Sequence, residues 1–393
     1  GVTLVATLGG LLFGYDTAVI SGAEKSIQAF LIDSQGLSSF LHGVTVSSAL
    51  IGCIVGGAIS GFMSSAYGRK NALIIAGVLF FLSALGSGNP EFLFFNKGEP
   101  SLGVLWMFNF YRVIGGVGVG LASAVCPMYI GEIAPAAIRG RLVSLNQFAI
   151  IFGMLIVYFV NWGIADGQSI EWINEIGWRR MFLSEALPAA VFILLMFLVP
   201  ESPRYLALKQ KDTEALSILT RVNGVEKAKQ ILEDIKSTVE TSKVKLYSYG
   251  KAVIIIGILL SVFQQFVGIN VALYYAPRIF ESMGAAKDAS MLQTIIMGLV
   301  NVVFTVVAIL TVDKWGRKPL LILGSIGMAI GMIAISTLAF LDIIGTTTLV
   351  FIIIYTASFM MSWGPICWVL ISEIFPNKIR SQAVAIAVAA QWA

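Results

Sequence analysis

Residues 261–277 read SVFQQFVGINVALYYAP and place three neutral amides, Gln264, Gln265 and Asn270, inside a long apolar segment. An amide that is buried in hydrocarbon without a hydrogen-bonding partner costs on the order of several kcal/mol. A polar ligand or a water-filled path is the usual compensation. Gly268 lies between the amides and is expected to let the helix bend, so that all three reach one cavity. Broken helices that line a cavity near the middle of the bilayer are typical of transporters.

The composition identifies a membrane protein. The chain has 393 residues, of which 57% are apolar and 12% are charged, whereas a soluble domain is usually about 25% charged. Apolar segments of spanning length are expected at residues 1–22, 43–64, 71–88, 104–130, 137–165, 178–199, 250–277, 289–311, 319–341, 345–371 and 379–393. The sequence thus predicts an all-α membrane protein with ten full spans and the start of an eleventh. Because the last segment stops at Ala393, the last span or spans are expected to be missing.

The basic residues fall mostly on one side of this series of spans. Most of the 26 Lys and Arg residues lie in the loops after even-numbered spans, and the largest group lies within residues 200–249. Cytoplasmic loops carry an excess of Lys and Arg, so the amino terminus is expected in the cytoplasm. Residues 200–249 are expected to form a cytoplasmic helical linker, with one helix from Asp212 to Gly224 and a second over Val225–Glu240. A passive linker and a small gate both remain open.

Three motifs occur twice in the same order, which indicates an internal repeat. The pairs are Gly14-Tyr-Asp16 with Gly268-Ile-Asn270, Gly68-Arg69-Lys70 with Gly316-Arg317-Lys318, and Glu132–Arg139 with Glu373–Arg380. We therefore expect two homologous six-span bundles, residues 1–199 and residues 250–393, with the second cut short. Two parallel halves related by a pseudo-two-fold axis, with a central site between them, are the architecture of major facilitator transporters.

Three ionisable residues, Asp16, Arg112 and Glu185, lie well inside apolar spans. Each is expected roughly 9–12 Å from the outer end of its span, so the three share one depth. An unpaired charge at this depth is costly. Arg112 does not readily lose its charge and would hold a carboxylate ionised until a conformational change weakens the pair. The three residues are expected to form a proton-coupling site, and a static ion pair that only orients helices is the alternative.

The second half has no comparable buried charge and carries neutral polar residues instead. These are Gln264, Gln265, Asn270, Asn301, Trp363, Gln391 and Trp392. Amides suit the hydroxyl groups of an uncharged polyol, and tryptophan suits the apolar face of a sugar ring. Gly364-Pro365 is expected to break the helix beside Trp363. Ordinary packing is the alternative for each tryptophan.

A further set of charged residues lies at the expected cytoplasmic ends of the spans. Its members are Glu132, Arg139, Arg141, Glu201, Arg204, Asp313, Arg317, Glu373 and Arg380. Matched acidic and basic groups on both halves could pair across the halves and close the cytoplasmic side. A single surface pair contributes about 0–1 kcal/mol, so such a gate would have to act as a network. Charges that only set the topology are the alternative.

Other classes of function find no support in the sequence. Cys53, Cys126 and Cys367 all fall in apolar segments, without disulfide or metal spacing. The glycine run 115–120 lies within a span and is not a nucleotide-binding loop. No nucleophile–base arrangement is visible, so we expect no enzyme, no cofactor and no metal. The net charge of +4 follows the loop topology and does not indicate nucleic acid. His42, the one histidine, lies at a segment edge and is interpreted as an interface residue.

Several motifs together resemble the sugar porter family of the major facilitator superfamily. They are Gly68-Arg69-Lys70, PMYIGEIAPAAIRGR (127–141), PESPR (200–204), QQFVGIN (264–270), DKWGRK (313–318) and WGPICWVLISEIFP (363–376). Within the family the chain is most similar to bacterial D-xylose–proton symporters. The resemblance implies a cell (inner) membrane protein with twelve spans that works as a monomer. It also implies alternating access and proton-driven import of a neutral monosaccharide.

The resemblance also implies roles for individual residues. Matches to sugar-binding residues, or to aromatic residues near the sugar, are Gln264, Gln265, Asn270, Tyr274, Trp363, Gln391 and Trp392. Asp16 matches the proton-coupling aspartate, and Arg112 and Glu185 match its charged neighbours. Facilitative glucose carriers usually have a neutral amide at the position of Asp16, which favours symport over proton-independent uniport. A sugar sensor that binds but does not transport is the remaining alternative.

The chain departs from the family pattern at two places. Met154 stands where the symporters and the glucose carriers have a sugar-binding glutamine. A thioether cannot replace the donors and the acceptor of an amide, so the sequence does not identify the sugar. The loop at residues 64–70 reads SSAYGRK and lacks the acidic residue usual before the glycine, whereas Asp313 keeps it in the second half. The first-half gate is therefore expected to be looser.

Overall fold

The structure is a computed structural model of the whole chain, and it describes residues 1–92, 94–135, 138–240, 250–343, 345–376 and 379–393. Within these residues every regular element is a helix. Ten helical stretches are long and apolar enough to cross a membrane, and a shorter apolar helix covers Gln382–Trp392. The predicted all-α membrane architecture is confirmed.

The first half contains six of these stretches, and the second half contains four of them and the shorter helix. The helices of the first half are α1 Val2–Ile27, α2 Ser39–Ala66, α3 Arg69–Gly88, α4 Leu102–Ile133, α5 Arg139–Ala165, α6 Ile170–Trp172, α7 Trp178–Leu183 and α8 Ala186–Leu198. Short π and 3-10 turns, Gln28–Ile32 and Asp33–Gln35, extend α1, and the π turn Ile173–Gly177 joins α6 to α7. The helices of the second half are α12 Lys251–Phe266, α13 Ile269–Tyr274, α14 Ala276–Ser282, α15 Lys287–Trp315, α16 Arg317–Phe340, α17 Thr346–Met361, α18 Trp363–Ile374 and α19 Arg380–Trp392.

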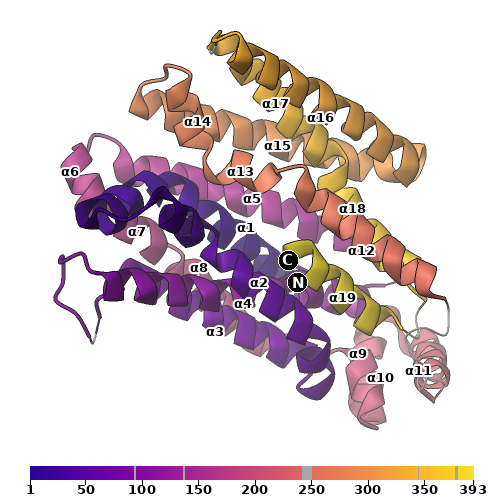
Figure 1. Cartoon of the computed structure of the whole chain (residues 1–393). Helices are drawn as coiled ribbons and strands as arrows, with labels where there is room; N and C mark the ends of the chain where they lie inside the picture. The colour runs from indigo at the N-terminus through magenta and orange to yellow at the C-terminus, as the bar shows by residue number, and fades with distance from the viewer. Residues whose placement is uncertain (93, 136–137, 241–249, 344, 377–378) are drawn as a thin grey trace.

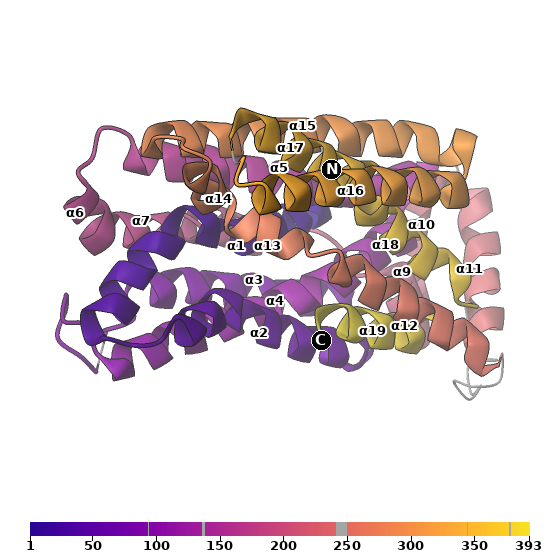
Figure 2. The same cartoon turned by 45° about the horizontal axis from the view of Figure 1, so that its top comes forward.

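The two halves form two bundles that lie side by side. Figure 1 shows α13–α17 above the first-half helices and α12 and α18 to their right, while α19 lies against α2. Helices α5 and α15 form a second contact between the halves. The linker helices gather at one end of the molecule, and α6 and α14 lie at the other (Figure 2). We call these the linker end and the far end.

Glycines, which have no Cβ atom, allow helices of the first half to cross at close range. A Cβ atom at Gly14 of α1 would collide with the carbonyl group of Ile150 on α5. A Cβ atom at Gly116 of α4 would meet the carbonyl group of Ala49 on α2. Backbone atoms cannot move aside as a flexible side chain does, so glycine is needed for this distance between helices.

Both predicted breaks in the second-half spans are confirmed. Gly268 has φ +82°, in the left-handed region that favours glycine, and it separates α12 from α13. The hydroxyl of Tyr355 donates to the freed carbonyl of Val267 at 2.5 Å. Ser362 separates α17 from α18, immediately before Trp363-Gly364-Pro365. The amides near Gly268 therefore lie at a turn between two short helices.

The sixth span is also broken, at Ser184 and Glu185 between α7 and α8. Pro188 lacks an amide hydrogen, and its ring would clash with the carbonyl of Ser184 four residues earlier in a regular helix. The break leaves Glu185 as the N-cap residue of α8, inside the bundle.

Two of the three linker helices have the predicted bounds, and the first, α9, was not predicted. The three are α9 Pro203–Leu208, α10 Asp212–Asn223 and α11 Val225–Glu240. Gly224 ends α10 with φ +82°. Apolar side chains including Leu206, Leu219 and Leu232 pack into a small core of their own, so the linker is a compact helical unit at its end of the molecule.

Candidate functional site

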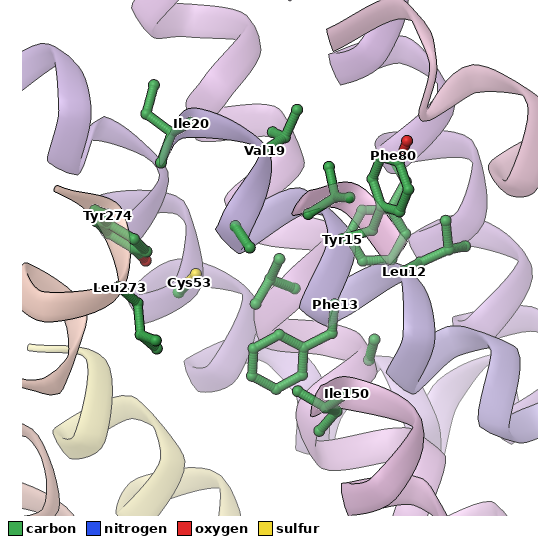
Figure 3. Packing of buried hydrophobic residues seen from close by; sticks show 14 of the residues in the cluster. Leu12, Phe13, Tyr15, Val19, Ile20, Cys53, Phe80, Ile150, Leu273 and Tyr274 are labelled. Carbon is green, nitrogen blue, oxygen red and sulfur yellow. The ribbon is translucent and has the colours of Figure 1, made fainter. Parts of the chain in front are cut away.

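A cavity lies between the two halves at the break around Gly268. Its lining residues come from α1, α5, α12, α13, α17, α18 and α19, and they are Phe13, Thr17, Gln147, Ile150, Ile151, Met154, Gln264, Gln265, Ile269, Asn270, Leu273, Tyr274, Phe359, Met360, Gly364, Trp368, Gln391 and Trp392. Figure 3 shows Phe13 and Ile150 near each other, with Leu273 and Tyr274 reaching in from α13. The wall is apolar with a few amides and tryptophans, as is usual for small-molecule sites.

The amides singled out in the sequence meet in this cavity. Asn270 donates through Nδ2 to Gln265 Oε1 at 2.7 Å, across the Gly268 turn. Gln391 donates through Nε2 to Gln264 Oε1 at 2.9 Å, from α19 to α12. The first bond is local and the second joins residues 127 positions apart, and together they hold the amides in one orientation.

Two polar groups at the cavity keep an unused hydrogen-bonding capacity. Gln391 Oε1 and Trp392 Nε1 are buried and have no hydrogen-bond partner among the described residues. The ring of Trp392 also packs edge-on against Phe13 of the first half, with 5.7 Å between ring centres. Buried polar groups in native proteins are nearly always paired. An acceptor, a donor and an aromatic face around one cavity fit a polyhydroxylated ligand.

The structure places the two tryptophans of α18 differently. Trp368 lines the cavity, whereas Trp363 is not among the lining residues, and its Nε1 donates to Ser325 Oγ of α16 at 2.8 Å. Five residues correspond to about 140° around a helix, so the two rings point in different directions. Sequence reasoning chose Trp363 because the helix breaks beside it. The position of Trp368 depends on how α18 is rotated in the bundle.

Sequence reasoning also missed Gln147, which lines the cavity together with Met154. Both residues belong to α5 and are seven positions apart, so they share one face of the helix. This spacing was the available signal, because Met154 was already under consideration. Gln147 gives the first half an amide at the cavity.

A second cavity continues from the first toward the linker end. The two share Phe13, Gln147, Ile150 and Trp368. The second cavity extends along the parts of α4, α5, α15 and α18 nearest the linker end, where its lining includes Pro127, Val143, Val312 and Ile371. The central cavity therefore has a path toward that end.

The three intramembrane charges come together in the first half. Arg112 donates to Asp16 Oδ1 at 2.7 Å and to the Asp16 backbone carbonyl at 3.1 Å. Asp16, Arg112 and Glu185 are only 0%, 1% and 0% exposed. The charge of Glu185 interacts with both of the others. Asp16 directly precedes Thr17, a cavity residue on the same helix, so the charged cluster adjoins the cavity.

The cluster holds two carboxyl groups and one guanidinium. Asp16 Oδ2 and both oxygens of Glu185 have no hydrogen-bond partner among the described residues. One guanidinium compensates one carboxylate, and a second buried carboxylate would be costly. A proton on one of the two carboxyl groups removes that excess charge and supplies a donor. The geometry can therefore bind and release a proton.

The acidic and basic residues at the linker end pair within each half. Arg69 donates through Nε and Nη2 to the two carboxylate oxygens of Glu132, at 2.8 Å each. Arg317 makes the corresponding pair with Glu373, with Nη2 to Oε1 at 2.8 Å. The side chains of the first pair are largely buried, at 7% and 11% exposed, whereas those of the second pair are 30% and 48% exposed.

Residues of the PESPR segment cover the first pair. Ser202 donates to Glu132, and Glu201 accepts from the backbone N–H groups of Arg69 and Lys70. Burial raises the pKa of Glu201, against the lowering effect of these donors. The segment thus fastens the loop between α2 and α3, and the expected looseness of the first-half gate is not seen.

The cross-half gate expected at the linker end is not seen in the described residues. Arg139 and Arg141 are exposed at the start of α5, and Arg204 is half-buried in α9. The side chains of Asp313 and Arg380 lie outside what the structure describes. The pairing stays within each half because each motif places its arginine and glutamate at the ends of neighbouring helices of one bundle.

The far end carries the ion pairs that join the halves. Among the described residues these are Glu24 with Arg278, at 2.8 Å between Oε1 and Nε, and Lys25 with Glu281. Both join α1 to α14. The halves are therefore tied together at the far end, and the central cavity extends toward the linker end.

The geometry agrees with the comparisons to known proteins. The family profile described as "Sugar (and other) transporter" matches residues 2–393. The chain is 53% identical over 405 residues to the D-xylose-proton symporter of Escherichia coli, covering 100% of this chain and 82% of that protein. It is 38% identical over 399 residues to the glucose facilitated diffusion protein of Zymomonas mobilis, covering 100% and 84%.

A solved structure of a sugar transporter also matches this chain. The major facilitator proton:xylose symporter XylE of E. coli, bound to 6-bromo-6-deoxy-D-glucose, matches with a TM-score of 0.89 at 52% identity, covering 100% of this chain and 85% of that chain. Fold, relatives and site are those of transporters and not of enzymes. The chain belongs to the sugar transporter family of the major facilitator superfamily.

Proposed function

We propose that this chain imports a neutral monosaccharide, D-xylose or a close relative of it, together with a proton. The observation that carries the proposal is the adjacency of two sites on α1. Phe13 and Thr17 line the amide-rich cavity, and Asp16 between them belongs to the buried charged cluster. A change in the charge of Asp16 therefore acts on the helix that forms one wall of the cavity.

In this proposal the amides bind the sugar hydroxyls and the tryptophans contact the ring. The amides are Gln147, Gln264, Gln265, Asn270 and Gln391. The unpaired Gln391 Oε1 and Trp392 Nε1 would take a hydroxyl donor and a hydroxyl acceptor. Trp368, rather than Trp363, takes the stacking role, and Tyr274 closes the cavity from α13.

Asp16 carries the transported proton, and Arg112 holds its carboxylate when the proton is absent. Glu185 is the second carboxyl group of the cluster and shares the same arginine. Proton binding to Asp16 weakens its ion pair with Arg112 and frees α1 to move against α4. The sugar and the proton thereby favour the same conformational change, which is the requirement for coupled transport.

We further propose that the linker end faces the cytoplasm of the cell (inner) membrane, because most basic residues of the chain lie in the loops at that end. The amino terminus is then cytoplasmic. The present conformation faces inward, with its outer end closed by the pairs between α1 and α14. One chain supplies all walls of the cavity, so a monomer in the bilayer suffices for transport.

The test compares the protein with Asp16→Asn in proteoliposomes. An inward proton gradient should drive accumulation of D-xylose by the unchanged protein and not by the variant. Sugar counterflow, which needs no proton gradient, should persist in the variant. Asp342→Asn, an exposed position in the turn after α16, is the control and should accumulate sugar normally.

Each alternative has its own signature in this assay. Gradient-driven accumulation by Asp16→Asn would refute the coupling role of Asp16. Counterflow without accumulation in the unchanged protein would indicate facilitated diffusion, the activity named for the Zymomonas relative. Sugar binding without any uptake would indicate a sensor.

A further inference from the structure

The far end contains an acid–histidine–arginine cluster that includes one of the pairs closing this end; its acid and histidine are buried, and the histidine has no role in the proposed transport cycle. Glu24 of α1 and His42 of α2 belong to the first half, and Arg278 of α14 belongs to the second. Glu24 is 1% exposed and His42 is 5% exposed. His42 is the one histidine in the chain. The cluster therefore combines a buried carboxylate, a titratable ring and a cation supplied by the other half.

The hydrogen bonds show how the cluster is satisfied in the closed state. Arg278 donates through Nε to Glu24 Oε1 at 2.8 Å and through Nη2 to Gln28 Oε1. His42 Nε2 lies 3.2 Å from the backbone carbonyl of Glu24, so this nitrogen carries a hydrogen. Glu24 Oε2 lies 3.4 Å from the same nitrogen, yet it is buried and has no hydrogen-bond partner among the described residues. One oxygen of Glu24 thus binds the second half, and the other is available for a proton or a stronger donor.

The charges around His42 determine what its protonation does. Glu24 on α1, Asp33 just after α1 and Arg278 on α14 act on the His42 ring, and Tyr275 packs edge-on against it. Lys25 and Glu281 act on Glu24. Lys25 and Glu281 neutralise each other as a pair. With neutral His42, the pair of Glu24 and Arg278 is also balanced. A proton added to His42 places a second positive charge near Arg278, and this repulsion outweighs the attraction of the exposed Asp33, so it is unfavourable.

Opening of the far end removes this conflict. If α14 moves away from α1, Arg278 leaves with the second half, while Glu24 and His42 remain together in the first half. Protonated His42 then compensates Glu24, so both buried charges stay paired. A proton placed on Glu24 itself also removes the attraction for Arg278. Proton uptake at either group therefore favours separation of the halves at this end.

We propose that Glu24, His42 and Arg278 form a second proton-binding site, which acts as a proton-released lock on the far end. The deprotonated site ties α1 to α14 and keeps this end closed. A proton bound by the pair of Glu24 and His42 releases Arg278 and allows the end to open. If the far end faces outward, as in the proposed function, acid outside the cell returns the carrier to the state that accepts external sugar.

The inference rests on the proposed function only through alternating access, so its test measures conformation and not transport. Spin labels would be attached to cysteines introduced at Ser38, before α2, and at Leu341, after α16. Both positions are exposed and both lie at the far end, one on each half. The three native cysteines are buried. Pulsed electron–electron resonance then reports the distance between the halves from pH 8 to pH 5 in sugar-free protein. Asp16→Asn is the background throughout, which removes the titration of the proposed transport site.

In the labelled protein, the ratio of open to closed populations should rise about tenfold as the pH falls, within the usual range of roughly 5- to 150-fold for coupled sites. His42→Gln should show a weaker pH response, because glutamine can donate to the Glu24 carbonyl but cannot become charged, so that only Glu24 remains to take up a proton. Arg278→Gln should be open at all of them. Lys25→Gln is the matched control, since it breaks the neighbouring, more exposed pair and should keep the pH response.

The outcomes separate this inference from the proposed function. An equal pH response in His42→Gln and in the unchanged cluster would overturn the lock, whatever the transport assays show. A closed far end in Arg278→Gln would overturn it as well. A pH response that depends on His42 supports the lock even if Asp16 proves to have no role in coupling. If Arg278→Gln does not fold, the comparison of His42→Gln with Lys25→Gln decides the question alone.

Discussion

Met154 offers a direct test of the sugar site, because it is a sulfur-containing side chain in a cavity otherwise equipped with amides. It lines the cavity from α5, two helical turns beyond Gln147 on the same face. Met154→Gln keeps an unbranched side chain of similar length and adds two donors and one acceptor. The new amide faces the cavity, so water can satisfy it before sugar binds.

The expected gain follows from the number of hydrogen bonds that the new amide makes. One net hydrogen bond contributes about 0.5–1.5 kcal/mol. A single bond to a sugar hydroxyl should therefore lower the Kd for D-xylose by roughly 2- to 13-fold. The walls that already hold the sugar remain unchanged, so no ordering cost is added apart from that of the glutamine side chain.

Isothermal titration calorimetry with D-xylose, and separately with hexoses and inositols, measures the effect. Met154→Leu is the matched control, since it preserves the apolar wall and should leave the Kd within about twofold, as expected for a volume-conserving change. An equal Kd in Met154→Gln and Met154→Leu would refute the placement of residue 154 at the sugar. A preference that changes from one sugar to another would show that this position selects the substrate.

Two further predictions concern stability, measured by thermal unfolding in detergent. Glu91→Gln should lower the free energy of unfolding by about 3–5 kcal/mol, because it leaves the buried Arg179 guanidinium without its carboxylate. Burial raises the pKa of Glu91, but the hydrogen bonds and charge of Arg179 outweigh it and hold that pKa below its ordinary value of 4.5. The stabilisation by the Glu91–Arg179 pair is thus present above pH 4.5 and lost as the pH falls below it. Glu91→Gln should lack this acid-induced loss of stability. The same loss in both proteins would contradict the role given to Glu91. Gly14→Ala should lower the free energy of unfolding by about 1–3 kcal/mol, because the new methyl group meets the Ile150 backbone. The control Gly163→Ala has open space around it and should be neutral or stabilising. Equal melting temperatures for the two variants would show that α1 and α5 do not need this close approach.

Local signals in the sequence were enough for the spans and for the two breaks in the second half, but the break at Ser184 and Glu185 was not predicted. Apolar runs of spanning length gave the spans, and the duplicated motifs gave the two halves. Gly268 and the segment Trp363-Gly364-Pro365 marked two breaks correctly, because a left-handed residue or a proline interrupts a helix wherever it lies. The end of α10 followed from Gly224 for the same reason, and Asp212 marked its start.

The buried charges show the limit of such reasoning. Asp16, Arg112 and Glu185 could be grouped from the sequence because a charge inside a membrane needs a partner, and the chain offers few. At the linker end charges are abundant, and any of several pairings was possible. In the structure Arg69 pairs with Glu132 and Arg317 pairs with Glu373, each within one half.

The sequence by itself thus determined the membrane class, the twofold repeat, the two helix breaks of the second half and the charged cluster around Asp16. Only the tertiary structure decided that Trp368 and Gln147 face the cavity, that Trp363 binds Ser325, and that Glu24 meets Arg278 across the halves. The physical reason is that composition and helical periodicity are properties of one segment. The face that a helix turns to its neighbours, and the end at which two bundles touch, depend on the packing of all the helices together.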